Sequence, residues 1–239
     1  MGIGGQAVDR VVVGSRPLGQ YRSAARVSTL SAMSLSSLAR SEREELCALM
    51  LEVGPDAPTL NEGWTVVDLA AHLVSREHDL WAGPGIVIGG PLAKLTEMAR
   101  KRRRRQGLER LVVMLRRGEP ALFRFAPAGT QLNEFYIHHE DVRRPNGLPP
   151  RTDRPDLDEA LVRLVRGSAR LLLRNFDGGI DLVWNGGVVY RRGPEPRAEI
   201  IGSPGEILLY LSGRRQAAQV ELEGDPAALA ALEQAGLGS

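Results

Sequence analysis

Residues 133–144 read Asn-Glu-Phe-Tyr-Ile-His-His-Glu-Asp-Val-Arg-Arg. On a helix, Glu134 and His138 lie one turn apart and point the same way, so the two side chains can bind one metal ion together. At about 100° per residue, Asp141 falls on the same face, close enough to orient an imidazole. His139 lies about 100° round from His138. We therefore expect Glu134 and His138 to be metal ligands supported by Asp141, and we do not assign His139 to the site.

A third ligand must come from another helix, and the chain has four histidines. His72 is the best candidate, because it flanks the apolar stripe of Leu69 and Leu73, where a partly buried neutral imidazole needs a partner. His78 has charged neighbours and is interpreted as a surface residue. Two histidines and one carboxylate leave open positions on an ion, which is typical of catalytic sites. The alternative is structural, because a histidine at the edge of a helical core is more often hydrogen-bonded within the protein, and Glu-x3-His alone is a weak pattern.

The composition is that of an ordinary globular protein. The chain has 239 residues, of which 43% are hydrophobic and 25% are charged, so neither wholesale disorder nor a membrane protein is indicated. No stretch approaches the roughly 18 apolar residues that span a bilayer. Cys47 is the only cysteine, which excludes a disulfide framework and a thiolate-rich zinc site. We expect a cytoplasmic protein.

Positive charge is concentrated at one place. The net charge is only +2, but residues 100–105 read Arg-Lys-Arg-Arg-Arg-Arg. Such a run repels itself, and we expect it to lie in solvent. The alternative is contact with an acidic partner such as RNA or anionic lipid. Because no aromatic residues alternate with these cations to stack on bases, nucleic-acid binding is not expected.

Helical periodicity covers most of residues 33–150, which we interpret as one domain. Residues 1–32 lack sustained periodicity and are expected to be a disordered extension. Glycine and proline break the following helical patterns, and antiparallel helices joined in this way form a bundle. The expected helices cover about 36–53, 65–81, 92–102, 107–117 and 129–144. The apolar positions expected to form their core are Trp64, Leu69, Leu73, Leu111, Leu115, Phe135 and Val142.

The pattern changes after Pro149-Pro150, and residues 151–239 are predicted to be a small α+β domain. Asn185-Gly186 between two short apolar runs is a strong hairpin signal. Ser203-Pro204-Gly205-Glu206 has the residues of a helix N-terminus. The expected elements are helices at about 156–174 and 226–234, a helix that begins at 203, and strands at 180–184, 188–190, 198–201 and 219–223. The fold class of the whole chain is therefore α+β.

Three segments give the chain a family resemblance. They are Thr-Leu-Asn-Glu-Gly-Trp at 59–64, Asp-Leu-Ala-Ala-His-Leu-Val at 68–74, and Glu-x3-His-x2-Asp-Val-Arg at 134–143. In this order they resemble the mycothiol-dependent maleylpyruvate isomerases of the DinB-like superfamily. The resemblance is closest over about 36–147. At 54–60, 84–86 and 138–144 the residues are similar to those of an actinobacterial branch of the family whose reaction is not established. Relatives often have cysteine where this chain has Asn61.

The resemblance implies a fold and a metal site. It implies a four-helix bundle followed by a small C-terminal α/β domain. In the bundle a divalent metal, expected to be zinc, is bound by His72, Glu134 and His138. Asp141 is then the residue that orients His138.

The resemblance also implies a chemistry, in which the metal activates the sulfur of mycothiol as cosubstrate. The chain is then a thiol-dependent isomerase or S-transferase acting on a small electrophile. Arg143 or Arg144 would neutralise an acidic substrate, unless both are solvent-facing cations at a helix C-terminus. The alternative function is a non-catalytic metal-binding or ligand-sensing protein. No catalytic residue, substrate or oligomeric state is indicated.

Overall fold

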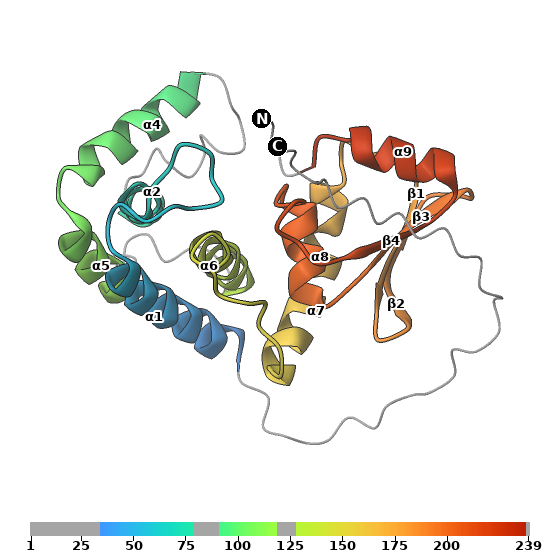
Figure 1. The fold of residues 1–239 in the computed structure, drawn as a ribbon, viewed down its shortest axis with the longest axis horizontal. Helices are drawn as coiled ribbons and strands as arrows, with labels where there is room; N and C mark the ends of the chain where they lie inside the picture. The colour runs from blue at the N-terminus through green and yellow to red at the C-terminus, as the bar shows by residue number, and fades with distance from the viewer. Residues whose placement is uncertain (1–33, 79–90, 119–127, 238–239) are drawn as a thin grey trace, which may run out of the picture. The chain divides into compact units, whose positions relative to one another are not determined.

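The computed structural model describes residues 34–78, 91–118 and 128–237. These residues form two compact units, one ending at Leu164 and the other beginning at Val165. The regular elements wholly within the first unit are helices, whereas the second unit holds a four-stranded sheet with helices (Figure 1). The α+β class predicted from the sequence therefore agrees with the structure. The expected extension of residues 1–32 lies outside the described residues.

The helices of the first unit begin and end at the signals seen in the sequence. Ser34 accepts a hydrogen bond from the Ser37 N–H at 3.1 Å, and Gly54 ends the same helix with a φ of 87°. Thr65, just before the second helix, donates from its hydroxyl and its N–H to Asp68 Oδ2, at 3.0 and 3.3 Å, so the carboxylate satisfies the N–H at the start of that helix. The helices lying wholly in the described part of this unit are α1 (Leu35–Val53), α2 (Val66–His78), α4 (Pro91–Arg104), α5 (Leu108–Arg117) and α6 (Ala128–Arg143).

One apolar core joins these helices. Helix α1 packs on α5 and α6, and α2 packs on α4 and α5. Trp64 is partly buried against the core. The other six predicted core residues are confirmed as buried: Leu69, Leu73, Leu111, Leu115, Phe135 and Val142.

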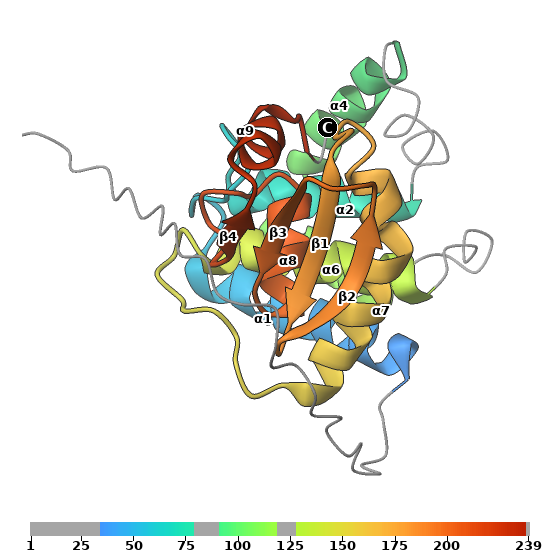
Figure 2. The same cartoon turned by 90° about the vertical axis from the view of Figure 1, so that its right-hand side faces the viewer.

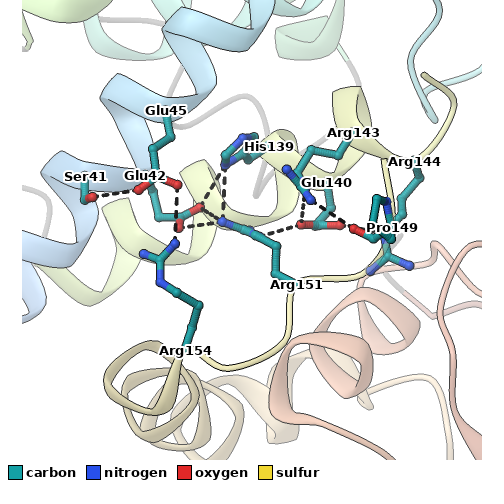
Figure 3. Close-up of polar contacts among 10 residues, drawn as sticks. All are labelled: Ser41, Glu42, Glu45, His139, Glu140, Arg143, Arg144, Pro149, Arg151 and Arg154. Carbon is teal, nitrogen blue, oxygen red and sulfur yellow. Dashed lines mark hydrogen bonds and ion pairs between the residues drawn. The ribbon is translucent and has the colours of Figure 1, made fainter. Parts of the chain in front are cut away.

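A buried network of charges also joins α1 to α6 (Figure 3). Glu42 of α1 and Glu140 of α6 are both 0% exposed. Arg151 donates to both oxygens of Glu42, at 2.6 and 2.7 Å, and to Glu140 Oε1 at 2.7 Å. His139 Nδ1 lies 3.1 Å from Glu42 Oε2. Arg151 follows the proline pair at which the sequence places the domain boundary, yet it is anchored in the first unit, which continues to Leu164.

The second unit is built on a mixed sheet in the order β2-β1-β3-β4. Strand β1 pairs antiparallel with β2 and parallel with β3, and β3 pairs antiparallel with β4. The hairpin predicted between β1 and β2 is present, with φ of 50° at Asn185 and 73° at Gly186, as a two-residue type I′ turn requires. The strands are β1 (Gly179–Trp184), β2 (Gly187–Arg192), β3 (Arg197–Ile201) and β4 (Glu221–Gly224).

Helices cover this sheet. Helix α8 (Pro204–Leu211) lies against one face of the sheet (Figure 2). Leu182 of β1 and Ile200 of β3 are 0% exposed. Helix α9 (Pro226–Gln234) packs on β3 and β4, and α7 (Pro155–Leu172) runs across the division between the units. No helix in the described ranges has the length and apolar character needed to cross a membrane.

The first prediction tests the core. Leu111 is 0% exposed, so Leu111→Ala removes buried methyl groups and leaves a cavity. We expect the free energy of unfolding, measured by urea denaturation, to fall by about 2–5 kcal/mol. Val113→Ala on the same helix is the control, because Val113 is 46% exposed and should change stability by no more than about 0.5 kcal/mol. An equally small change at Leu111 would contradict the packing.

The second prediction concerns pH. Burial raises the pKa of Glu42, but His139 and Arg151 outweigh it and lower the pKa from 4.5 to about 2. A carboxyl group whose pKa is lower in the folded than in the unfolded state stabilises the fold at pH values above its unfolded-state pKa. This stabilisation is lost as the pH falls through its folded-state pKa. Between pH 4.5 and about 2, wild type should therefore lose unfolding free energy more steeply than Glu42→Gln.

Urea denaturation at several pH values measures this slope. The control is Glu44→Gln, at an exposed carboxyl of the same helix. Parallel curves for wild type and Glu42→Gln would contradict the stabilising role of the ionised Glu42.

Candidate metal centre

Helix α2 places His72 against His138 of α6, and Glu134 lies beside His138 on α6. Among the described residues, these three predicted ligands do not form a group whose ligand atoms all lie within 4.8 Å of one another. The rings of His72 and His138 are in edge contact, with centroids 5.5 Å apart. His138 Nε2 lies 3.7 Å from Glu134 Oε2, as expected for residues one turn apart on α6. His72 and Glu134 are partly buried and His138 is buried.

Asp141 fixes the orientation of His138. Its Oδ2 lies 2.8 Å from His138 Nδ1, which leaves Nε2 on the side of Glu134. Burial lowers the pKa of His138, but the bonds to Asp141 and Glu134 outweigh it and raise the pKa above its ordinary value. A carboxylate on the far nitrogen of a histidine is the usual way in which proteins orient a metal-binding imidazole.

His72 is held as a neutral imidazole. Burial, together with the positive charge of His138 and Arg76, lowers its pKa to about 3. Its ring lies 5.2 Å from that of Trp64, centroid to centroid. At neutral pH this side chain therefore offers an unprotonated ring nitrogen, the form that binds metals.

Glu134 is ionised and paired with Arg76. Burial raises its pKa, but His138 and Arg76 lower it to about 2. Arg76 Nη1 lies 2.5 Å from Glu134 Oε2, yet this buried oxygen receives no hydrogen bond of acceptable geometry. A carboxylate beside a neutral imidazole and an oriented one is a donor set that suits a divalent cation such as zinc, which would compete with Arg76 for Glu134.

The basic run contributes to the wall of this site, and the expectation that all of it lies in solvent is wrong for Arg100. Arg100 is 9% exposed and its guanidinium lies 4.7 Å from the centroid of Trp64. It also pairs with Asp68 and Glu97. The carboxylates of Asp68 on α2 and Glu97 on α4 hold Arg100 inward, and Arg104 also pairs with Asp68, whereas Lys101 is exposed, as expected.

A second group of candidate ligands lies elsewhere in the first unit. Ligand atoms of Glu42, Glu45 and His139 all lie within 4.8 Å of one another. Glu42 and Glu45 lie three residues apart on α1, but the sequence pattern did not indicate that His139 of α6 lies beside them. Arg151 already neutralises Glu42 with two hydrogen bonds, and the cation of Arg151 would repel a metal ion there.

Arg143 and Arg144, expected near an acidic substrate, contact a carboxylate of the protein itself. Arg144 Nε donates to Glu140 Oε2 at 2.5 Å, and Arg143 Nε lies 3.2 Å from Glu140 Oε1. Arg143 also donates to the Pro149 carbonyl at 2.9 Å. Both arginines therefore neutralise a buried charge, a partnership that the sequence pattern did not reveal.

Comparison with known proteins gives a likeness of fold. No protein-family model and no curated protein matches the sequence. The solved structure of a mycothiol-dependent maleylpyruvate isomerase is similar over 80% of this chain and 93% of that chain, with 18% identity and a TM-score of 0.50. A mutant of such an isomerase gives the same coverage and identity with a TM-score of 0.49. The chain thus resembles mycothiol-dependent maleylpyruvate isomerase in fold.

Proposed function

We propose that the chain binds a divalent metal ion, zinc being the expected one, through His72, Glu134 and His138, and uses it to activate a small thiol. The observation that carries this proposal is the grouping of side chains around His138, whose Nε2 lies 3.7 Å from Glu134 Oε2 and whose ring is in edge contact with that of His72. The proposal includes a DinB-like four-helix bundle over residues 33–150, a separate small domain over 151–239, and a cytoplasmic location.

The donor set matches the chemistry. Two imidazoles and one carboxylate satisfy zinc and leave a coordination position open. Bound there, the ion would lower the pKa of a thiol so that the thiolate is present at neutral pH. His72 contributes by staying neutral and Glu134 by staying ionised, whereas Asp141 holds His138 in one orientation.

The thiol and the reaction class are taken from the similar structure, whose name states dependence on mycothiol and the isomerisation of maleylpyruvate. On this basis we propose mycothiol or a similar small thiol as cosubstrate, a small electrophile as substrate, and isomerisation or S-transfer as the reaction. Arg143 and Arg144 stay the proposed partners of an acidic substrate. Such a substrate must replace Glu140, to which both arginines are bound.

A second candidate function is metal binding or ligand sensing without catalysis. The observation on its side is the close approach of Glu42, Glu45 and His139, and the guanidinium of Arg151 on Glu42 opposes a metal ion there. The two functions differ in which residues hold the ion and in whether a thiol is consumed.

The third prediction assigns the ligands. Alanine at His72, Glu134 or His138 should abolish stoichiometric zinc, because two remaining ligands hold zinc poorly against a chelator. The measurement is elemental analysis of the purified full chain after dialysis against a weak chelator. His78→Ala, His139→Ala and Glu42→Ala are controls that should keep the metal. Loss of zinc in Glu42→Ala and His139→Ala, with retention in the His72, Glu134 and His138 variants, would transfer the site to the second group.

The same loaded protein tests the reaction. Mycothiol consumption is followed with a panel of small electrophiles, and we expect thiol loss that requires the zinc and disappears in Glu134→Ala. Stoichiometric zinc at the triad without any thiol consumption would support the non-catalytic alternative.

The fourth prediction concerns Arg76, whose guanidinium competes with an ion for Glu134. Arg76→Met removes a neighbouring cation, so zinc should bind about two- to fivefold more tightly, as the small energy of a partly exposed ion pair allows. Competition titration with a chromophoric chelator measures this change. Arg116→Met, which breaks the surface pair with Glu44, is the matched control and should leave the affinity unchanged. Weaker binding in Arg76→Met would contradict the competition and make Arg76 a support of Glu134.

A further inference from the structure

Asn61 contacts the carboxylate that orients His138. Asp141 is 0% exposed, and its Oδ2 lies 2.8 Å from His138 Nδ1. Asn61 Nδ2 donates to the same oxygen at 2.9 Å. One carboxylate oxygen therefore joins the side-chain amide of Asn61 to the imidazole of His138.

A short turn holds Asn61 in this position. The Thr59 hydroxyl donates to the Trp64 carbonyl at 3.0 Å and accepts from the Asn61 N–H at 3.2 Å. The Trp64 N–H donates to the Asn61 carbonyl at 3.0 Å. The Leu60 N–H donates to the backbone carbonyl of Asp141 at 2.9 Å, so the turn is tied to α6 by its main chain as well. The amide of Asn61 thus reaches Asp141 from a fixed backbone.

We propose that Asn61 is a positioning residue of the metal centre, which acts on His138 through Asp141. This inference rests on the proposed binding of metal by His138. The buried Asp141 carboxylate needs hydrogen-bond donors, and a second donor on Oδ2 fixes the plane of the carboxylate against the His138 ring. His138 then presents Nε2 towards Glu134 without rotating.

The same turn also reaches the second imidazole. Trp64, at the end of the turn, packs on the His72 ring. One segment therefore contacts the surroundings of both histidines, although these come from different helices. At position 61 the side-chain amide of asparagine donates a hydrogen bond to Asp141 of α6. The thiol of a cysteine at this position would be only a weak hydrogen-bond donor.

The competing explanation is that Asn61 simply ties the turn to α6. Asn146 provides the matched control, because its Nδ2 donates to the Pro58 carbonyl at 3.1 Å and to the Val142 carbonyl at 2.7 Å. Asn146 thereby joins the start of the turn, at Pro58, to Val142 of α6, and neither of these two bonds involves Asp141. A purely structural role predicts similar effects of Asn61 and Asn146 variants on metal binding.

The experiment compares Asn61→Asp, Asn61→Ala and Asn146→Ala in the full chain. Asn61→Asp is nearly isosteric but replaces the donor by a carboxylate that repels Asp141. Zinc affinity, measured by chelator competition, should fall about 10- to 100-fold in Asn61→Asp, as is usual when a residue behind a ligand is changed. Asn61→Ala should lie between Asn61→Asp and wild type, and Asn146→Ala should stay within about threefold of wild type. Equal affinities in wild type and Asn61→Asp would overturn the inference.

A metal-free readout separates this inference from the proposed function. Two-bond ¹H–¹⁵N spectra of the metal-free chain report the protonation of each imidazole nitrogen, with the four histidines assigned from single variants. The His138 nitrogen shifts should change in Asn61→Asp and stay unchanged in Asn146→Ala. If wild type binds no zinc, the proposed function fails, and these spectra still decide whether Asn61 acts on His138. Unchanged His138 shifts in Asn61→Asp would overturn the inference.

Discussion

Arg151 neutralises two carboxylates that have no contact with solvent, Glu42 on α1 and Glu140 on α6. A buried charge left without a partner costs several kcal/mol, so these three groups must stay together in the folded chain. Because Glu42 and Glu140 belong to different helices, the network fixes how α6 is rotated and shifted against α1. This rotation decides which side chains of α6 face Arg151 and which face α2.

The two faces of α6 divide its polar residues into two sets. His139 and Glu140 belong to the charge network, where every acidic group has a cationic or imidazole neighbour. Glu134 and His138 lie on the side of His72, where Glu134 is paired with Arg76 of α2. The first set stabilises the fold, whereas the second is the set that an ion would complete. The neighbouring residues His138 and His139 therefore differ in role, because His138 lies beside Glu134 and His139 lies beside Glu42.

Short-range signals made much of this predictable. Helical spacing placed Glu134 on the same face as His138, and the capping and hairpin residues gave the element bounds within a few residues. Contacts between residues far apart in the sequence were not predictable, because no periodicity reports them. Glu42 and Arg151 are separated by 109 positions, and charged residues are ordinarily interpreted as surface. The burial of Arg100 and the contact of Asn61 with Asp141 were missed for the same reason.

The central claim is that an ion is held by two imidazoles and one carboxylate on α2 and α6. X-ray absorption spectroscopy of the zinc-loaded full chain measures that ligand set directly. We predict two imidazole nitrogens and one carboxylate oxygen at about 2.0–2.2 Å, with a further light atom in the open position. A shell with a single imidazole and two carboxylates would match Glu42, Glu45 and His139 instead and would contradict the account.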